Sequence, residues 1–246
     1  MAKTLILIPS RMAATRLPGK PLLKINNLSM VSHVFKRAEE ANIGEVVVAT
    51  EDQEILEDVL KNGGKAVLTS NDPQTGTDRI FEAFQKLNIK NIDYILNLQG
   101  DEPNIDKNDI IKLNDLMINS ESEVGTLAAI IQHDKMLNDK NVVKVITESK
   151  LEKNNFPSAL NFTRENLLIN DKNIYHHIGI YSYKVSTLEK FVRLDQTDSE
   201  KINKLEQLRA LDNKIKINVA LARSSPVGVD TEEDYLAIKK IMEYKI

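Results

Sequence analysis

Three cations stand close together after the first apolar run of the chain. Arg11, Arg16 and Lys20 follow the segment "TLILIP", and no acidic residue precedes Glu39. Such a short apolar run is typical of a strand buried on both faces, and ligands of open α/β sheets bind at the carboxyl ends of such strands. Arginine offers a planar fork for phosphate oxygens, and lysine offers a movable point charge. Because the whole chain has a net charge of -3, this local excess indicates a small anionic ligand rather than a nucleic acid.

The segment around these cations has no glycine-rich phosphate loop. Neither G-x-x-x-x-G-K-[ST] nor G-x-G-x-x-G occurs in the chain. Phosphates would therefore be held by side chains and by the backbone amides of a loop shaped by proline and glycine. The alternative interpretation is a solvated basic loop, which is the usual explanation for an isolated pair of cations.

Two acidic residues far apart in the sequence also follow short apolar runs. Asp101 comes after "LNLQG", and Asp230 comes after "PVGV". Carboxylates beside a triphosphate site suit Mg²⁺, which takes one or two of them and completes its shell with water and phosphate oxygens. Each residue also has a simpler interpretation, since Gly-Asp is a common turn dipeptide and either Asp230 or Thr231 could cap the last helix.

A further polar segment stands before a predicted helix. Gln74, Thr75, Gly76 and Thr77 precede a helical pattern that opens with Asp78 and Arg79. Hydroxyl groups, an amide and the free N–H groups of a helix start could read a base edge or bind a phosphate. Taken alone, the segment is more typical of a helix cap.

The composition excludes several classes of protein. The 246 residues include no cysteine, which excludes disulfides, thiolate catalysis and zinc-thiolate sites. The first apolar run is too short for the core of a signal peptide, and no apolar stretch approaches the ~20 residues of a membrane span. With 28% charged and 41% hydrophobic residues, we expect a cytoplasmic protein without membrane insertion.

Strand and helix patterns alternate along the first half of the chain. Strands are predicted at 4–9, 45–50, 65–69 and 93–99, with helices at 29–44, 53–64 and 77–87. These β-α repeats predict an α/β fold with a mostly parallel, doubly wound, Rossmann-like sheet. The second half is richer in strands, which are predicted at 123–131, 141–147, 158–163, 175–184 and 214–222. Two more helices are predicted, at 199–213 and 231–244.

Taken together, the motifs indicate a protein family far more specifically than any one motif does. In order they read "IPSRMAATRLPGKPL", "QTGTDR", "LNLQGDEP", "HIGIYSYK", "LEQLRAL" and "GVDTEED". This series closely resembles the 3-deoxy-D-manno-octulosonate (Kdo) cytidylyltransferases, also called CMP-Kdo synthetases, over almost the whole chain. The resemblance implies one nucleotidyltransferase domain over 1–246. Its nucleotide-binding part would cover about 1–125 and 210–246, and a β-rich insert for dimerisation and sugar binding would cover about 126–209.

The resemblance also implies roles for individual residues. Arg11 and Lys20, with Asp101 and Asp230 as ligands of Mg²⁺, would be catalytic. The residues implied to contact CTP are Pro9, Ser10, Arg11, Ala13, Ala14, Arg16, Lys20, Gln74, Thr75, Gly76, Thr77, Arg79 and Gly100. Those implied to line the pocket for the sugar acid are Gln99, Arg164, His177, Tyr181, Glu206 and Gln207. As in the family, the protein would form a homodimer, and CMP-Kdo would serve lipopolysaccharide biosynthesis.

Chemistry alone would not single out the residues of the sugar-acid pocket. His176 and His177 are adjacent in a predicted strand, so they point to opposite faces and cannot bind one metal ion together. Tyr181 and Tyr183 share the face of His177, and core packing is the simpler interpretation. Glu206 and Gln207 would otherwise be ordinary residues of a helix surface.

The chain departs from the family pattern at three places. His176 stands where the family usually has arginine, Glu232 stands where it often has proline, and no Ile-Pro follows Arg164. Two of these positions lie in the implied sugar-binding part, so 8-amino-Kdo and a nonulosonic acid such as sialic acid stay open as alternative substrates.

Two other classes of protein are alternatives. Nucleotide-sugar glycosyltransferases typically carry an Asp-x-Asp motif, whereas Gly100 and Glu102 flank Asp101 here. A nucleotide sensor would have no need of two carboxylates that converge on a metal.

Overall fold

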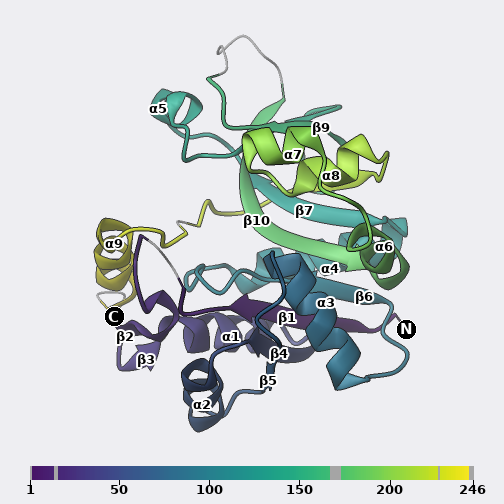
Figure 1. Ribbon diagram of the computed structural model, residues 1–246. Helices are drawn as coiled ribbons and strands as arrows, with labels where there is room; N and C mark the ends of the chain where they lie inside the picture. Colours follow the sequence, from purple (N-terminus) through teal and green to yellow (C-terminus); the bar gives the residue numbers. More distant parts are fainter. Residues whose placement is uncertain (1, 14–15, 167–172, 227, 244–246) are drawn as a thin grey trace. The chain divides into compact units, whose positions relative to one another are not determined.

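The computed structural model describes residues 2–13, 16–166, 173–226 and 228–243 (Figure 1). The chain forms two compact units. The first comprises Met1–Ile111 and Pro226–Ile246, and the second comprises Lys112–Ser225.

The first unit contains a sheet of four parallel strands. Its order is β6 (Tyr94–Asn97), β1 (Thr4–Ser10), β4 (Gly44–Thr50) and β5 (Ala66–Leu68). All seven residues of β1 are buried, as expected for a central strand whose side chains are apolar on both faces. Thr4 pairs with Gly44 on one side and with Tyr94 on the other, so the three strands end at one edge. This part of the predicted fold is confirmed.

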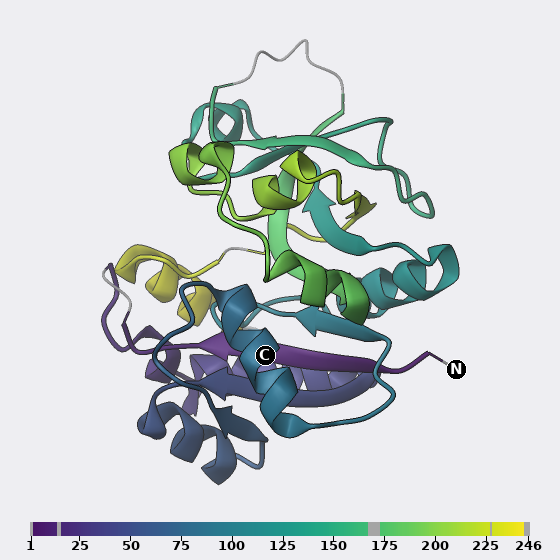
Figure 2. The same cartoon turned by 45° about the vertical axis from the view of Figure 1, so that its right-hand side comes forward.

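Three helices connect the parallel strands of this sheet. They are α1 (Met30–Ala41), α2 (Gln53–Lys61) and α3 (Gly76–Leu87). The chain moves outward from β1 to β5 through α1 and α2 and then returns to β6 through α3. Because such crossovers are right-handed, α3 covers the opposite face from α1 and α2. Figure 2 shows α3 in front of the strands and α1 behind them.

Short elements and the last helix complete the first unit. The one-turn helix η1 (Lys20–Leu22) leads into a small hairpin of β2 (Lys24–Ile25) and β3 (Leu28–Ser29). Near it lies α9 (Glu232–Glu243), at the left of Figure 1. Ile25, Met30, Val229 and Ile238 form a buried cluster that fixes the segment carrying Asp230 onto this hairpin.

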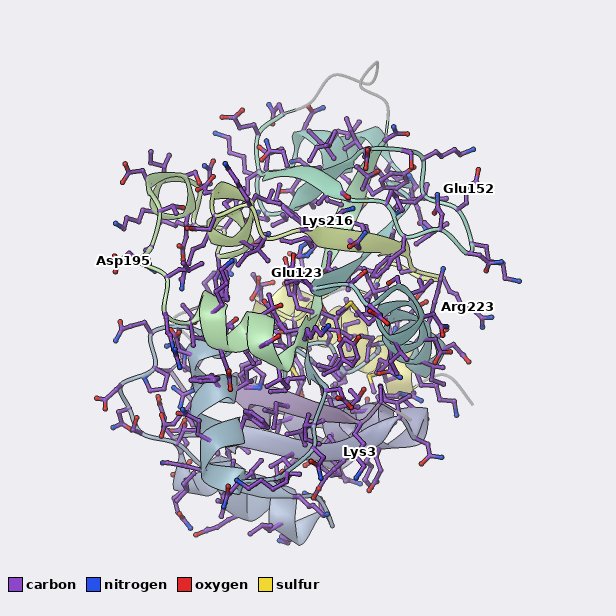
Figure 3. All side chains as sticks on the ribbon, turned by 90° about the vertical axis from the view of Figure 1, so that its right-hand side faces the viewer. Lys3, Glu123, Glu152, Asp195, Lys216 and Arg223 are labelled. Atoms are coloured by element: carbon purple, nitrogen blue, oxygen red, sulfur yellow. The ribbon has the colours of Figure 1, made fainter. Side chains whose placement is uncertain are left out.

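The second unit is rich in strands, as its sequence predicts, and most of these strands pair antiparallel. Strand β10 (Ile174–Lys184) pairs antiparallel with β7 (Val124–Ala129) and β8 (Lys144–Thr147), and β8 pairs with β9 (Ala159–Thr163). Strand β11 (Ile217–Leu221) runs parallel to β7. Glu123 and Lys216, labelled in Figure 3, directly precede these two parallel strands.

The remaining helices are mostly short. They are α4 (Lys107–Ser120), which begins in the first unit, and α5 (Asp134–Asn138), α6 (Val185–Phe191), α7 (Asp198–Asn203) and α8 (Gln207–Asp212). The single helix predicted over 199–213 is wrong. Lys204 has φ 53° and ψ 46°, a left-handed conformation that ends α7 before α8 begins. Among the described residues, no helix combines the length and apolar character needed to cross a membrane.

Candidate active site

A pocket of about 340 Å³ lies at the carboxyl end of the parallel strands of the first unit. Its volume lies at the lower end of the range usual for ligand sites. Four separate motifs of the sequence meet there. The lining residues predicted from the sequence are Pro9, Ser10, Arg11, Ala13, Arg16, Lys20, Gln74, Thr75, Gly76, Arg79, Gln99, Gly100, Asp101 and Asp230.

Among the described residues predicted to contact CTP, Thr77 alone is not in this lining. Thr77 is only 1% exposed and lies inside the first turn of α3, outside this lining, so its contact with CTP stays a prediction. The chain turns into the helix at Gly76, which directs the Thr77 side chain into the core. Ala14 lies outside the described residues.

Two glycines allow the loops around the pocket to approach one another closely. A Cβ atom on Gly100 would lie 3.2 Å from the carbonyl oxygen of Pro9. A Cβ atom on Gly76 would lie 3.3 Å from Cγ of the same proline. Both distances are tighter than ordinary van der Waals contact, so an alanine at either position would need Pro9 or the loop to shift by a few tenths of an ångström.

Lys20 joins the two carboxylates that the sequence places beside the triphosphate site. Its Nζ donates to Oδ2 of Asp101 at 2.7 Å and to the carbonyl oxygen of Val229 at 2.8 Å. Oδ1 of Asp230 lies 3.4 Å from the same nitrogen. Arg16 also contacts Asp230, with Nη2 2.9 Å from Oδ2. Asp101 and Asp230, 129 positions apart in the chain, therefore converge on one cation.

The cap of the last helix is Thr231 rather than Asp230. Oγ1 of Thr231 accepts a hydrogen bond from the backbone N–H of Asp234, and Asp234 Oδ2 accepts one from the backbone N–H of Thr231. This reciprocal pair is a capping box. The side chain of Asp230 is therefore available for Arg16 and Lys20.

The segment before α3 combines a helix cap with part of the pocket wall. Thr75 and Asp78 form a reciprocal capping box, as the cap interpretation of this segment predicts. Arg79 lines the pocket, but it is only 3% exposed and its guanidinium is held by protein groups. It donates to Glu51, Thr69 and the carbonyl of Ser70. A buried arginine of this kind needs such a partner, because an uncompensated charge would be costly.

Two predicted sugar-acid residues of the second unit, His177 and Tyr181, belong to a row of rings on β10. His177 lies 5.4 Å from Tyr181 between ring centroids, and Tyr181 lies 5.9 Å from Tyr183. Between Ile178 and Tyr181 the strand advances three residues while β7 advances one. The two extra residues are an even number, so the three rings keep the shared face that the sequence predicts.

His177 is held as a neutral imidazole. Thr126 Oγ1 donates to the carbonyl oxygen of Ile180 at 2.7 Å, so it accepts from His177 Nε2, which lies 3.1 Å away. Burial, with smaller contributions from the charges of His176 and Arg164, lowers the pKa of His177 to about 3. Burial also raises the pKa of Tyr181 well above its usual range, and nearby Tyr183 and Glu206 add to this shift. Both side chains are therefore uncharged near neutral pH.

The other predicted sugar-acid residues lie on separate elements. Arg164 Nη1 donates to the carbonyls of Lys140 and Asn141 at 3.2 and 3.1 Å. Glu206 and Gln207 stand at the start of α8. Gln99 belongs to the first unit, where it lines the pocket and donates through Nε2 to Asn97.

Comparison with known proteins identifies the family. The model of the cytidylyltransferase family matches residues 5–217. The 3-deoxy-manno-octulosonate cytidylyltransferase of Rhodopseudomonas palustris (strain BisB18) is 42% identical over 243 residues, which are 98% of each chain. The enzyme of that name from Afipia carboxidovorans is 44% identical over 240 residues, which are 97% of this chain and 96% of its own length. This chain belongs to the 3-deoxy-manno-octulosonate cytidylyltransferase family.

A solved structure agrees with this assignment. A CMP:2-keto-3-deoxy-manno-octonic acid synthetase complexed with CTP is similar over the whole of both chains, with a TM-score of 0.90 and 34% identity. A 4-diphosphocytidyl-2C-methyl-D-erythritol synthase from Anaerococcus prevotii has a TM-score of 0.63 at 12% identity, which shows a shared fold and no more.

Several residues that support the sites of this family member are missed by sequence reasoning. Glu51 and Asp52 stand directly after β4, and the only signal in the sequence is an acidic pair at a strand end. Glu51 pairs with Arg79, which lines the pocket, and Asp52 contacts Met12, the neighbour of the lining residue Arg11. In the second unit Arg209 donates to both carboxylate oxygens of Glu200, at 2.8 and 2.6 Å. Arg209 Nη2 also lies 3.8 Å from a carboxylate oxygen of Glu206. Arg209 belongs to the motif "LEQLRAL" that marks the family resemblance.

Proposed function

We propose that this chain converts CTP and Kdo into CMP-Kdo and pyrophosphate. One observation carries the proposal: the basic loop, the segment before α3 and two converging carboxylates line a single pocket in a member of this family. The similar synthetase complexed with CTP supports the choice of nucleotide. The names of the relatives support Kdo as the sugar acid.

The reaction joins the anomeric hydroxyl of the sugar to the α-phosphorus of CTP. The bond from that phosphorus to the bridging oxygen breaks, pyrophosphate leaves with the electron pair, and the proton of the hydroxyl passes to water. Arg11, Arg16 and Lys20 surround the place where negative charge grows, and such preorganised charge is usually the largest contribution to catalysis. No side chain of the protein need form a covalent bond, so binding and orientation of the two substrates supply the rest.

Asp101 and Asp230 are the residues that would hold Mg²⁺. Their carboxylates and the Val229 carbonyl already surround one cationic group, the Lys20 ammonium. These are the hard oxygen ligands that magnesium prefers. The described residues include no cluster of three or more His, Cys, Asp or Glu that could hold a metal, which is consistent with an ion that is also bound by phosphate oxygens and water. When bound, magnesium neutralises phosphate charge and lowers the pKa of a bound hydroxyl.

Binding of the nucleotide would then exchange the partners of the charged groups. Without ligands, Lys20 and Arg16 are paired with Asp101 and Asp230. A triphosphate would take over the two cations, and a divalent ion would take over the two carboxylates. Each charge keeps an opposite partner in both states.

We choose Kdo over other sugar acids in this proposal because the relatives are named 3-deoxy-manno-octulosonate cytidylyltransferases. The departures at His176 and after Arg164 keep 8-amino-Kdo and a nonulosonic acid as alternatives. A homodimer, a cytoplasmic location and a role in lipopolysaccharide biosynthesis are further proposals that rest on family membership. Sedimentation velocity of the purified protein would test the dimer.

The function is tested by pyrophosphate release from CTP, UTP, ATP, GTP and dTTP with each of three sugar acids. We expect CTP with Kdo to be turned over fastest, UTP weakly and the purine nucleotides hardly at all. Equal turnover with purine nucleotides would refute the assignment to CTP. Faster turnover with sialic acid or 8-amino-Kdo would retain the chemistry and replace Kdo.

A further inference from the structure

We propose that Asp52 is a positioning residue that fixes the basic loop for the phosphates of CTP. Oδ2 of Asp52 accepts a hydrogen bond of 2.7 Å from the backbone N–H of Met12, which lies 40 positions earlier in the chain. Met12 directly follows Arg11, which lines the pocket. The contact therefore fixes the backbone beside a cation that faces the nucleotide site.

The location of Asp52 indicates that its carboxylate serves the loop rather than its own helix. Asp52 is the N-cap residue of α2 and has the extended backbone typical of that position, φ -96° and ψ 121°. A cap carboxylate normally accepts from the backbone N–H of the second or third helical residue. No such hydrogen bond is present here. Asp52 instead directs the carboxylate to Met12, while the positive end of α2 still favours its charge.

The turn that carries Asp52 is held firmly by its neighbours. The backbone N–H of Asp52 donates to Thr50 Oγ1 at 3.1 Å, and Thr50 is fully buried. The carbonyl of Thr50 accepts from the backbone N–H of Thr69 at 2.7 Å. Glu51, between Thr50 and Asp52, forms the ion pair with the buried Arg79. The carboxylate thus projects from a fixed base, as an anchor for a loop requires.

Removal of the Asp52 carboxylate should raise both the accessibility of the basic loop and the KM for CTP about tenfold. A hydrogen bond from a charged group to a neutral partner is stronger than one between neutral groups, and at the lower end of its usual contribution its loss should make the loop about tenfold more accessible. The same factor should appear in KM for CTP, because the loop must be ordered when the nucleotide binds. This second expectation rests on the proposed function, whereas the first concerns the loop alone.

Limited digestion with trypsin measures loop order without any substrate. Trypsin can cleave after Arg11 and Arg16, whereas Lys20 is followed by Pro21, which blocks cleavage. Mass spectrometry would identify new fragments that begin at Met12 and Leu17. We expect Asp52→Ser to be cleaved there about tenfold faster than the wild type. Serine can still cap α2 but is too short to reach Met12, so this variant separates the loop contact from the helix cap.

Two variants control the experiment. Asp52→Asn keeps an acceptor oxygen at the same reach and should restore most of the protection and most of the affinity for CTP. Glu54→Ser changes an exposed acid in the first turn of the same helix and should behave as the wild type. The kcat of Asp52→Ser should stay within about threefold of the wild type, because Asp52 touches neither substrate. Thermal unfolding of every variant checks that each is folded.

Two results would overturn the role of Asp52. One is wild-type cleavage of the loop in Asp52→Ser, and the other is equal loss of protection in Glu54→Ser. If the wild type releases no pyrophosphate from CTP, the proposed function fails, and the cleavage rates still decide whether Asp52 orders the loop.

Discussion

Replacing Lys20 by methionine should have opposite effects on metal binding and on catalysis. The Lys20 ammonium lies close to oxygens of both carboxylates that are proposed to hold Mg²⁺. Without nucleotide it therefore competes with the metal for these oxygens. With nucleotide bound, the same ammonium is proposed to stabilise the leaving pyrophosphate. Lys20→Met removes both effects and nearly preserves the length of the side chain.

The expected gain in metal affinity of Lys20→Met can be calculated from the charges and their separation. A divalent ion and an ammonium about 4 Å apart repel each other by about 2 kcal/mol in a water-like dielectric. That energy corresponds to about 30-fold in affinity. Lysine can partly withdraw and salt screens the repulsion, so we expect a measured gain of about tenfold. In contrast, kcat/KM should fall by about 100-fold or more, as when other preorganised charges are removed from a transition state.

Manganese is a suitable probe because it accepts the same oxygen ligands and its free form is visible by electron paramagnetic resonance. The titration would be done without nucleotide at low ionic strength. Lys24→Met is a matched control, since Lys24 also pairs with an aspartate at 2.7 Å but contacts Asp58 instead of the two pocket carboxylates. The reasoning is refuted if Lys20→Met binds Mn²⁺ no better than the wild type, or if Lys24→Met gains equally.

The other predictions concern the carboxylates and the buried histidine. Asp101→Asn and Asp230→Asn should each release almost no pyrophosphate at saturating magnesium and unfold near the wild-type temperature. In contrast, Thr231→Ala should lose about 1 kcal/mol of stability and keep most of its turnover. Full activity of Asp230→Asn would show that Asp230 is not a ligand of the metal. The pKa of His177 is about 3 in the folded chain, against an ordinary value of 6.5, so its neutral form stabilises the fold fully above pH 6.5 and this stabilisation is lost as the pH falls toward 3. Urea unfolding at several pH values should show a smaller acid-dependent loss for His177→Gln than for the wild type, and parallel curves would contradict a buried neutral imidazole.

The alternating part of the fold is predictable because it is encoded locally. Short apolar runs give β1, β4, β5 and β6, and the helical patterns between them give the crossovers. Since carboxyl ends of parallel strands meet at one edge, the convergence of the basic loop with Asp101 also follows from sequence reasoning. The break at Lys204 does not follow, because a lysine in a left-handed conformation carries none of the usual signal of a glycine.

The contact of Asp52 with Met12 is also invisible to sequence reasoning. An acid at a helix start is normally interpreted as a cap. That interpretation assigns Asp52 the right position and the wrong partner. The partner depends on how two neighbouring loops fold back at the end of the sheet, which no local pattern encodes.

The local excess of cations near the N-terminus is partly neutralised by acidic partners once the chain folds. Arg16, Lys20, Lys24 and Arg37 each contact an acid, and three of the four acquire a partner more than thirty positions away. Arg11 lines the pocket and forms no ion pair with any residue within the described ranges. Among the described cations that line the pocket, Arg11 is therefore the one whose charge no carboxylate neutralises before an anion binds.

This pairing of cations with acids determines how nucleotide and metal should influence one another. A triphosphate that attracts Lys20 and Arg16 leaves Asp101 and Asp230 without their partners, and a divalent ion at the carboxylates displaces the two cations. Either ligand alone separates charges that were paired, whereas both together restore every pair. The proposed pairing therefore predicts that CTP and the metal strengthen each other's binding, and linkage requires the two enhancements to be equal. Lys20→Met removes one of the exchanging partners, so the enhancement measured in that variant should be smaller from either side.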